Sequence, residues 1–329
     1  KGKLRFTVDV YQKYIKDLLQ KKVKMPTSIG YGNGYEVSYM NSGKMTNKGW
    51  EFRVDAVPFE NRDWRVGFYF NIAHNENKIT EMPDNYTEEN YTFNNGEYAY
   101  RREEGRPMGS FYGYRYKGVC HNQDATYARA ADGNVMKDLS GHAIVMRNGT
   151  ATIAPGDVLY ADINHDGVIN KHAIVYLGNS NPRLTGGAGV NVSYKQFKLS
   201  AIFYGSYGQD VVNSTRLNNE SMRGIDNQST AVLRRWRNEG DQTDIPRALY
   251  GEGYNTLGSD RFVEDASYLR LKSLSFNYRL PKKIIQRWGF SNIDVYVTGY
   301  NLFTWTKYTG QDPEVKSENT YARDSATTS

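Results

Sequence analysis

The segment 183–208 (RLTGGAGVNVSYKQFKLSAIFYGSYG) alternates apolar and polar residues with a strict two-residue period. One phase of its first half holds Leu184, Gly186, Ala188, Val190, Val192 and Tyr194, and the other phase includes Thr185, Asn191 and Ser193. After the corner Lys195-Gln196, the apolar phase continues with Phe197, Leu199, Ala201, Phe203, Gly205 and Tyr207, opposed by residues such as Ser200. Because successive side chains of a strand point to opposite faces, the pattern predicts a hairpin with one apolar and one polar face. The apolar face must pack on a protein core or on lipid.

The same alternation recurs along the chain and predicts an all-β fold. It indicates further strands at about 3–15, 50–56, 64–73 and 261–281, and a last strand that begins at 293 and ends in NLFTWTKYTG (301–310). Within 261–281 the apolar phase moves from Leu269 and Leu271 to Leu274 and Phe276, which predicts a β-bulge. We therefore expect about seven long strands.

The connections between these strands alternate in length, which suggests how the apolar faces are covered. Long connections fall at 16–48, 75–182 and 209–260, and short ones at 59–63, 195–196 and 281–292. In an antiparallel meander alternate connections emerge at the same end. Outer-membrane barrels are built in this way, with short periplasmic turns, long extracellular loops and strands of about ten residues. A soluble β-sandwich would show shorter strands and more frequent turns. Lipid is therefore the favoured solvent, and the long connections are expected to be extracellular.

Several classes of protein are excluded or disfavoured. The chain contains no run of about 18 apolar residues, so no transmembrane helix is expected. A net charge of +6 is spread over strands and loops, so no nucleic-acid groove is predicted. The single cysteine, Cys120, excludes an internal disulfide, and no catalytic or zinc-binding spacing is present. We expect no enzyme activity.

The segment 162–173 resembles the start of a calcium-binding loop. Side-chain oxygens stand at positions one, three, five and nine of the pattern, and glycine stands at position six: Asp162, Asn164, Asp166, Asn170 and Gly167. The twelfth position, which normally supplies a bidentate acid, is Ala173. Two interpretations stay open: a calcium site, or an Asx-rich turn that needs no metal.

Aromatic side chains in the long connections are candidates for contacts with a substrate. Tyr98 and Tyr100 lie in YTFNNGEYAYRR (91–102), and Trp236 lies beside the arginines of LRRWRNEG. Flat amphipathic rings could stack on sugars or hold peptides. The alternative is that they stiffen the loops or form part of an aromatic girdle at the membrane boundary.

Longer segments resemble a known family. Six segments resemble, in order, the C-terminal part of SusC/RagA-type TonB-dependent outer-membrane transporters. They are MTNKGWEFRVDAVPFENRDWRVGFYFNIAHNENKIT, GRPMGSFYGYRYKGV, PGDVLYADINHDGVIN, LGNSNPRLTGGAGVNVSYKQFKLSAIFYGSYGQDVVN, SDRFVEDASYLRLKSLSFNYRLPKKIIQRWG and VYVTGYNLFTWTKYTGQDPEV. The resemblance covers nearly the whole chain. It implies that residues 1–329 form one part of a plugged barrel of about 22 strands. The N-terminal plug, the early strands and the closing strand of that family have no counterpart here.

The resemblance also implies a function and partners. Such a barrel lies in the outer membrane of a Gram-negative bacterium, in contact with lipid, and imports oligosaccharides or oligopeptides. It works with a SusD-like surface lipoprotein and the TonB complex, and a dimeric assembly is a further expectation. The family usually carries an acid at the calcium position occupied here by Ala173. The alternatives are a siderophore-type receptor and a secreted or surface glycan-binding β-sandwich protein.

Overall fold

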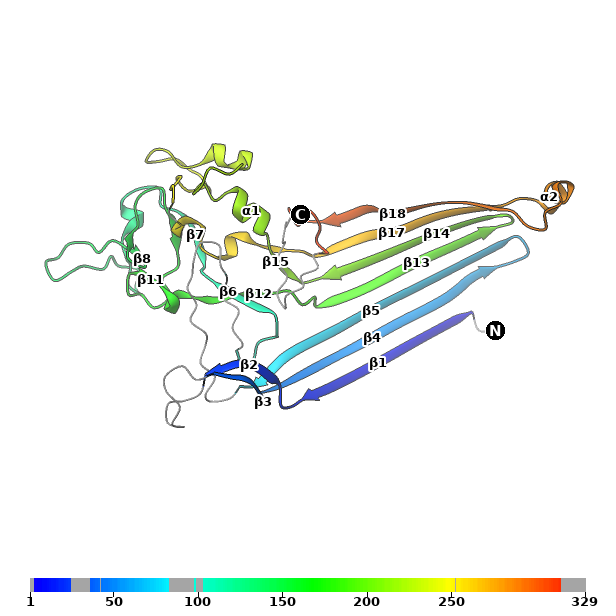
Figure 1. The fold of residues 1–329 in the computed structure, drawn as a ribbon, viewed down its shortest axis with the longest axis horizontal. Coiled ribbons are helices and arrows are strands. Elements are labelled where there is room, and N and C mark those ends of the chain that lie inside the picture. The colour runs from blue at the N-terminus through cyan, green and yellow to red at the C-terminus, as the bar shows by residue number, and fades with distance from the viewer. Residues whose placement is uncertain are drawn as a thin grey trace.

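The chain folds into a long, curved wall of strands with a lobe of loops at one end (Figure 1). The computed structural model describes residues 3–24, 36–41, 43–82, 98, 103–251 and 253–314. Seven long strands form the wall: β1 (Leu4–Ile15), β4 (Lys44–Glu60), β5 (Trp64–Glu81), β13 (Leu184–Tyr194), β14 (Phe197–Tyr207), β17 (Tyr268–Arg279) and β18 (Asp294–Thr306). They lie in one sheet in the order of the chain, and each neighbouring pair is antiparallel.

This meander confirms the all-β fold and its seven long strands. The hairpin predicted at 183–208 consists of β13 and β14, joined by Lys195 and Gln196. Its register pairs Leu184 with Tyr207. Lys195 takes a left-handed conformation with φ of 51°, as a two-residue turn between twisted strands requires. A β-sandwich needs two facing sheets, whereas the long strands here share one sheet, so that alternative finds no support.

Short and long connections lie at opposite ends of the wall (Figure 1). At the short-turn end, Asn61 accepts hydrogen bonds from the backbone N–H groups of Asp63 (2.9 Å) and Trp64 (2.8 Å), an Asx turn that closes β4 onto β5. The third connection at this end, the short one expected at 281–292, holds α2 (Lys282–Ile285) and the 3₁₀ turn η7 (Gln286–Trp288).

The predicted bulge is present in β17. Its register shifts between Leu271 and Ser273 against both neighbours, β14 and β18. The extra residue is Lys272, which returns Leu274 to the face that Leu271 occupies. The change of phase in the sequence is therefore a local irregularity of one strand rather than a boundary between two.

Two strand boundaries and one connection differ from the sequence-based expectation. Strand β4 begins at Lys44 rather than at 50, and β5 continues to Glu81 rather than ending near 73. The connection expected at 16–48 contains a hairpin of β2 (Leu19–Lys24) and β3 (Glu36–Asn41), which the sequence analysis does not indicate. These extensions pair through backbone hydrogen bonds but carry polar side chains, so their apolar alternation is lost before the strand ends.

The lobe is built from short elements of the two longest connections. The first supplies β6 (Ser110–Gly113), β7 (Tyr116–Val119), η2 (Asp124–Thr126), β8 (Arg147–Asn148), β9 (Ala151–Thr152), β10 (Val158–Tyr160), β11 (Val168–Ile169), η3 (Lys171–Ala173) and β12 (Val175–Asn179). The second supplies β15 (Asp210–Val212), α1 (Ser214–Asn219), η4 (Thr230–Arg234), η5 (Tyr254–Thr256), η6 (Asp260–Phe262) and β16 (Val263–Asp265). Within the described ranges, no helix is long and apolar enough to span a membrane.

Most of the buried apolar side chains lie in this lobe and few lie in the wall. One cluster contains Tyr114, Cys120, Met146, Val158, Tyr160 and Ile169, and a second contains Tyr98, Phe111, Val212, Leu217 and Phe262. The lobe therefore has a protein core of its own. The wall instead leaves large apolar side chains exposed. The two parts therefore differ in how their apolar side chains are covered.

Candidate functional site

The apolar face of the wall is built from rows of side chains that pair across the strands. One row runs through Leu4, Ala56, Phe68, Val190, Ala201 and Leu274. Large members of these rows are open: Phe6 is 68% exposed and Val10 is 80% exposed. A continuous apolar surface of this extent needs a partner other than water.

Aromatic side chains flank these rows at both ends. At the short-turn end, Trp64 packs on Tyr194 with ring centroids 4.3 Å apart, and Phe197 stacks on Tyr278 at 4.7 Å. At the long-connection end, Trp50 packs on His74 at 5.9 Å.

Tyr194 and Leu184 mark the two ends on β13 and are ten residues apart (194 minus 184), or roughly 33 Å along the strand. A tilt typical of membrane barrels reduces this to about 25 Å, the height of their apolar band.

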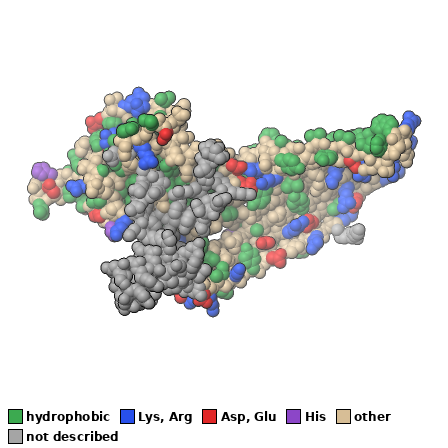
Figure 2. Space-filling model, viewed as in Figure 1, with side chains coloured by type: hydrophobic (Ala, Val, Ile, Leu, Met, Phe, Trp, Pro, Cys, Tyr) green, Lys and Arg blue, Asp and Glu red, His purple; other side chains and the backbone are tan. Residues whose placement is uncertain are grey.

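The opposite face of the wall is polar. Arg53 donates two hydrogen bonds of 2.8 Å to the carboxylate of Asp55, and Ser200 donates one of 2.6 Å to Asn191. Farther along the sheet, Lys272 donates to Glu314 at 2.8 Å. Charged side chains of both signs are visible over the strands in Figure 2. The two faces therefore meet environments of opposite polarity.

In the lobe, a buried carboxylate joins the two long connections. Asp157 is fully buried and accepts hydrogen bonds from Arg247 Nε at 2.7 Å and Nη2 at 3.1 Å. Asn255 donates to the same carboxylate at 3.1 Å. The bidentate pair ties residues 154–157 of the first connection to residues 247–255 of the second, and the hydrogen bond that Arg247 donates to Asp157 raises the pKa of Arg247.

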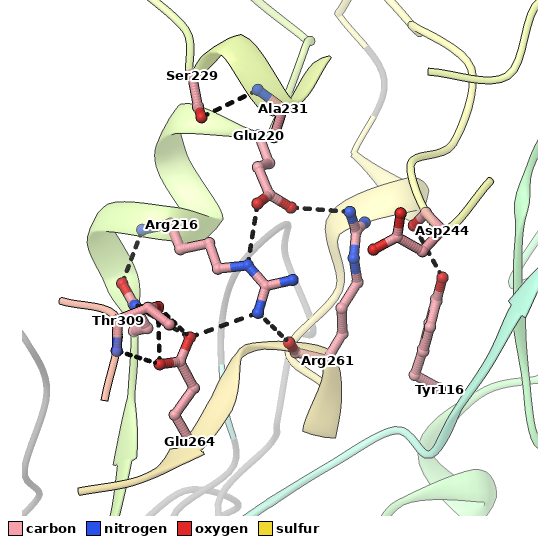
Figure 3. Close-up of polar contacts among 10 residues, drawn as sticks. Tyr116, Arg216, Glu220, Ser229, Ala231, Asp244, Arg261, Glu264 and Thr309 are labelled. Carbon is pink, nitrogen blue, oxygen red and sulfur yellow. Dashed lines mark hydrogen bonds and ion pairs between the residues drawn. The ribbon is translucent and has the colours of Figure 1, made fainter. Parts of the chain in front are cut away.

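A second buried network joins the lobe to the wall (Figure 3). The side chain of Arg261 is 3% exposed, and its Nη2 donates to Glu220 at 2.9 Å. Arg216 donates to the other oxygen of Glu220 at 2.9 Å and reaches Glu264 at 3.4 Å. Glu264 also accepts the backbone N–H of Thr309, just after β18, at 2.8 Å. This Arg216–Glu264 network thus fixes α1 and η6 to the end of the last strand.

The guanidinium of Arg261 also lies against aromatic rings. Its central carbon is 4.9 Å from the ring centroid of Phe262 and 5.6 Å from that of Tyr116. The hydroxyl of Tyr116 donates to the backbone carbonyl of Asp244 at 2.9 Å (Figure 3). Burial raises the pKa of Tyr116, so this hydroxyl stays protonated and keeps its donor role at neutral pH. The rings complete a low-dielectric enclosure around the ion pairs.

The DINHDG segment forms a closed turn. The carboxylate of Asp162 accepts the backbone N–H of Gly167 at 2.7 Å, and that of Asp166 accepts the N–H of Val168 at 2.8 Å. The bond from Val168 holds the pKa of Asp166 below its usual range. Gly167 has a φ of +79°, which favours glycine. The backbone turn that a calcium loop needs is therefore present.

The donor set fits calcium only in part. Asn170 accepts the N–H of His172 at 2.8 Å and begins the turn η3. Ala173, at the twelfth position, is completely buried in the first apolar cluster. No carboxylate can reach the loop from there, which removes the strongest ligand of the pattern. The described residues contain no group of three or more His, Cys, Asp or Glu side chains placed to hold a metal.

Calcium binding by Asp162, Asn164, Asp166 and Asn170 stays a prediction, with the affinity limited by the missing twelfth ligand. We expect a dissociation constant no tighter than about 10⁻⁴ M, in the range of weak extracellular sites. Isothermal titration with calcium chloride, compared with the Asp162→Asn variant, measures it. Absence of heat up to millimolar calcium would show that the segment is a metal-free turn.

The three candidate aromatic residues have different outcomes. Tyr98 is buried in the second cluster, packs edge-on against Phe111 and donates to the carbonyl of Ser259 at 2.8 Å. Its ring is covered by protein, which favours the loop-stiffening interpretation. Trp236 is half-buried and covers Gly156, where a Cβ would lie 2.4 Å from the indole ring. Tyr100 lies outside the described residues. Contact of these residues with substrate stays a prediction.

Cys120 is the lone cysteine and lies at the centre of the first cluster. Burial, with a smaller effect from the charge of Asp157, raises the pKa of its thiol to about 12. Because the thiolate is the reactive form, we expect no reaction with a thiol reagent at pH 8 until the lobe unfolds. Labelling followed by peptide mapping tests this, with the exposed Ser140→Cys variant as a positive control. Equal labelling of both sites in the folded protein would contradict the prediction.

The residues of the two buried networks were not singled out by the sequence. Glu220 and Arg261 are 41 positions apart, and Asp157 and Arg247 are 90 apart. Each is an ordinary charged residue in a polar stretch. Only the folding of the two connections against each other brings them together.

A meander with one apolar and one polar face between two aromatic belts is the wall of a transmembrane β-barrel. Comparison with known proteins shows which kind of barrel protein the chain resembles. The chain is 31% identical to TonB-dependent receptor P3 of Formosa agariphila over 328 residues, which is 97% of this chain and 29% of that receptor. It is 26% identical to TonB-dependent receptor SusC of Bacteroides thetaiotaomicron, over 96% of this chain and 28% of SusC. No family model matches the chain.

Solved structures agree with these relatives. The RagAB peptide transporter superposes with a TM-score of 0.69 at 26% identity, covering 94% of this chain and 31% of that chain. The resemblance to SusC/RagA-type TonB-dependent receptors that the sequence predicts is thereby confirmed. The chain spans under a third of the length of the proteins it matches.

Proposed function

We propose that the chain is part of the wall of an outer-membrane importer in a Gram-negative bacterium. The observation that carries this proposal is the two-faced meander, with an apolar band of membrane height and all short turns at one end. In this arrangement the apolar face contacts lipid and the polar face lines the barrel interior. The long connections 16–48, 75–182 and 209–260 then stand outside the cell.

Within this proposal the lobe contributes to the external entrance and the TonB complex supplies the energy for uptake. The imported substrate is an oligosaccharide or an oligopeptide, held beneath a SusD-like lipoprotein. Support comes from the relatives: one bears the name SusC, and the similar solved structure is described as a peptide transporter. None of the relatives is named as an enzyme, which agrees with a transport role.

Affinity purification of the full-length protein from outer membranes tests the proposal. We expect a surface lipoprotein to co-purify and mass spectrometry to identify its bound ligand. Recovery of the protein in the soluble fraction without detergent would contradict the membrane placement. A purified receptor that carries an iron chelate and no lipoprotein would support the siderophore-receptor alternative.

The sidedness of the wall has an independent test. Protease added to intact cells should cut inside the lobe, for example near the exposed Leu139 of the first long connection, and spare the connection near Trp288. Cleavage near Trp288 in intact cells would reverse the proposed orientation. This outcome is separate from the question of which substrate is imported.

A further inference from the structure

The polar face of the wall carries two neighbouring cations on β17, near the lobe. Arg270 lies opposite Tyr204, which shares the polar phase of Ser200 on β14. The side chain of Arg270 is 7% exposed, and its Nε donates to the hydroxyl of Thr304 at 2.9 Å. Lys272, the extra residue of the bulge, follows two positions later. One strand thus places two positive charges close together.

Aromatic rings border these two cations. The guanidinium carbon of Arg270 is 5.3 Å from the ring centroid of Tyr268, and Nζ of Lys272 is 5.7 Å from that of Tyr204. The two rings pack on each other with their centroids 6.1 Å apart. Rings of this kind attract a cation without neutralising its charge, so both charges stay open to an anion.

The anions come from residues that follow β18, at the lobe end of the wall (Figure 1). Arg270 donates through Nη1 to Glu314 at 2.9 Å and through Nη2 to Asp312. Lys272 donates to the same oxygen of Glu314 at 2.8 Å. Among the described residues, these two acids are the ion-pair partners of Arg270 and Lys272. The strands therefore supply a cationic site, and a connection supplies its occupant.

Other cations of the sheet are neutralised by acids of the strands themselves. Arg53 pairs with Asp55 on β4, and Arg279 on β17 pairs with Asp294 on β18. Such pairs form whenever the strands pair. The acids at Arg270 arrive instead from outside the sheet, as a displaceable occupant must.

The occupant, residues 312–314, is held as a short peptide. Asp312 also accepts the backbone N–H of Glu314 at 2.8 Å, which fixes the turn between the two acids. Gln209 donates through Nε2 to the backbone carbonyl of Pro313 at 3.2 Å. The site thus receives two carboxylates two residues apart and one peptide carbonyl. The side chains of Asp312 and Glu314 are 54% and 30% exposed, so a solute can compete for both contacts.

We propose that Arg270, Lys272 and Gln209 form a binding site for an acidic oligopeptide, and that residues 312–314 occupy this site until such a peptide displaces them. The inference rests on the proposed function, in which the polar face lines the barrel interior and the lobe end faces outside. A peptide with two acids in the spacing of residues 312 and 314 makes the same charge-assisted hydrogen bonds as the internal segment. Because the internal segment competes for the site, the apparent affinity for the peptide falls with the fraction of the site that is free.

Isothermal titration of the full-length protein in a mild detergent tests the proposal. The probe is the peptide Gly-Gln-Asp-Pro-Glu-Val with acetylated and amidated ends, and the control peptide has Asn and Gln in place of the two acids. We expect the acidic peptide to bind at least about tenfold more tightly, because the neutral peptide lacks hydrogen bonds between charged groups. Trigalacturonate is the acidic-sugar probe, and its binding in place of the acidic peptide would overturn the peptide assignment.

Two glutamine substitutions provide the matched comparison. Glu314→Gln removes the carboxylate that Arg270 and Lys272 share, whereas Glu81→Gln removes a carboxylate paired with the exposed Lys44. We expect Glu314→Gln alone to strengthen binding of the acidic peptide, by about tenfold, because the internal competitor loses its charge-assisted hydrogen bonds. Lys272→Gln added to Glu314→Gln should cancel this gain, because the peptide then meets one cation fewer.

Equal affinity of Glu314→Gln and Glu81→Gln for the acidic peptide, or no binding of this peptide by Glu314→Gln, would overturn the site. Residues 312–314 would then be a structural contact only. Heat-modifiable mobility and recovery in the outer-membrane fraction report insertion separately. A protein that inserts normally but does not distinguish the two peptides would refute only this site. A protein that never enters the membrane would refute the proposed function itself.

Discussion

A lysine in place of Val190 is expected to destabilise the wall by about 2–4 kcal/mol, the effect of a cation near the midplane of a membrane barrel. Val190 lies in the row between Phe68 and Ala201, close to the midpoint between the two aromatic belts. Its side chain is 38% exposed on the apolar face, so a lysine there would face hydrocarbon. Urea titration of the full-length protein in lipid vesicles, followed by heat-modifiable mobility, measures the change.

The adjacent residue supplies a matched control. Asn191 points to the other face, where it lines a hollow of about 650 Å³ beside Arg53 and Tyr69. Asn191→Lys has room and a polar environment, and it loses only the hydrogen bond from Ser200, about 1 kcal/mol. Equal destabilisation by the two lysines would contradict the assignment of the faces. A larger effect at Asn191 would reverse it.

The long strands are predictable from the sequence because each of their two faces meets a different solvent. In β13 and β14 every second residue faces one environment, so the two-residue period alone predicts the hairpin, its corner at Lys195 and its register. The bulge in β17 was predictable for the same reason, because Lys272 shifts the phase that follows it. These features are local and need no knowledge of the rest of the fold.

The strand ends could not be read in this way. Strands β4 and β5 continue beyond the aromatic belt as a two-stranded extension, in which Asn47 pairs with Asn77 and Lys44 pairs with Glu81. Backbone hydrogen bonds hold these extensions, and most of their side chains are polar, with Ile79 as the buried exception. An alternation of apolar and polar residues has no physical cause there, so the sequence gives no signal.

The candidate site residues show a further limit. A tyrosine in a polar loop can present its ring to a ligand or bury the ring in the protein. The sequence around Tyr98 is compatible with both. Its burial depends on Phe111 and Phe262, which come from other segments. Ala173 was recognisable as a missing calcium ligand from the spacing alone. Its burial in the first apolar cluster, which leaves no room there for a larger side chain, is visible only in the folded structure.

Removal of Glu220 is expected to destabilise the attachment of the lobe by about 3–5 kcal/mol, because it leaves a charge buried without its partner. Arg261 has a side chain 3% exposed, and its acceptor is Glu220. In Glu220→Ala its guanidinium would stay enclosed by Tyr116 and Phe262 with no carboxylate to offset the desolvation. Arg216 keeps Glu264 and the carbonyl of Arg261. The loss therefore falls mainly on Arg261.

Hydrogen–deuterium exchange of the folded protein measures this effect where it occurs. We expect faster exchange at α1 and η6 and after β18, where Thr309 binds Glu264. The exposed pair Lys44–Glu81 is the control, because Glu81→Ala removes a carboxylate that is 55% exposed and should change stability by less than about 1 kcal/mol. Exchange at α1 no faster in Glu220→Ala than in Glu81→Ala would contradict the role of the network.

A double variant separates the loss of attraction from the burial of an unpaired charge. Glu220→Leu combined with Arg261→Met removes both members of the pair and leaves apolar groups of similar size in the same enclosure. Replacement of a buried ion pair by apolar side chains is often neutral or stabilising. We therefore expect the double variant to restore slow exchange at α1, although Glu220→Ala alone does not. Such a rescue would mean that the pair selects one arrangement of the lobe on the wall. That packing is possible when both charges are present or when both are absent, but not when one charge is buried alone.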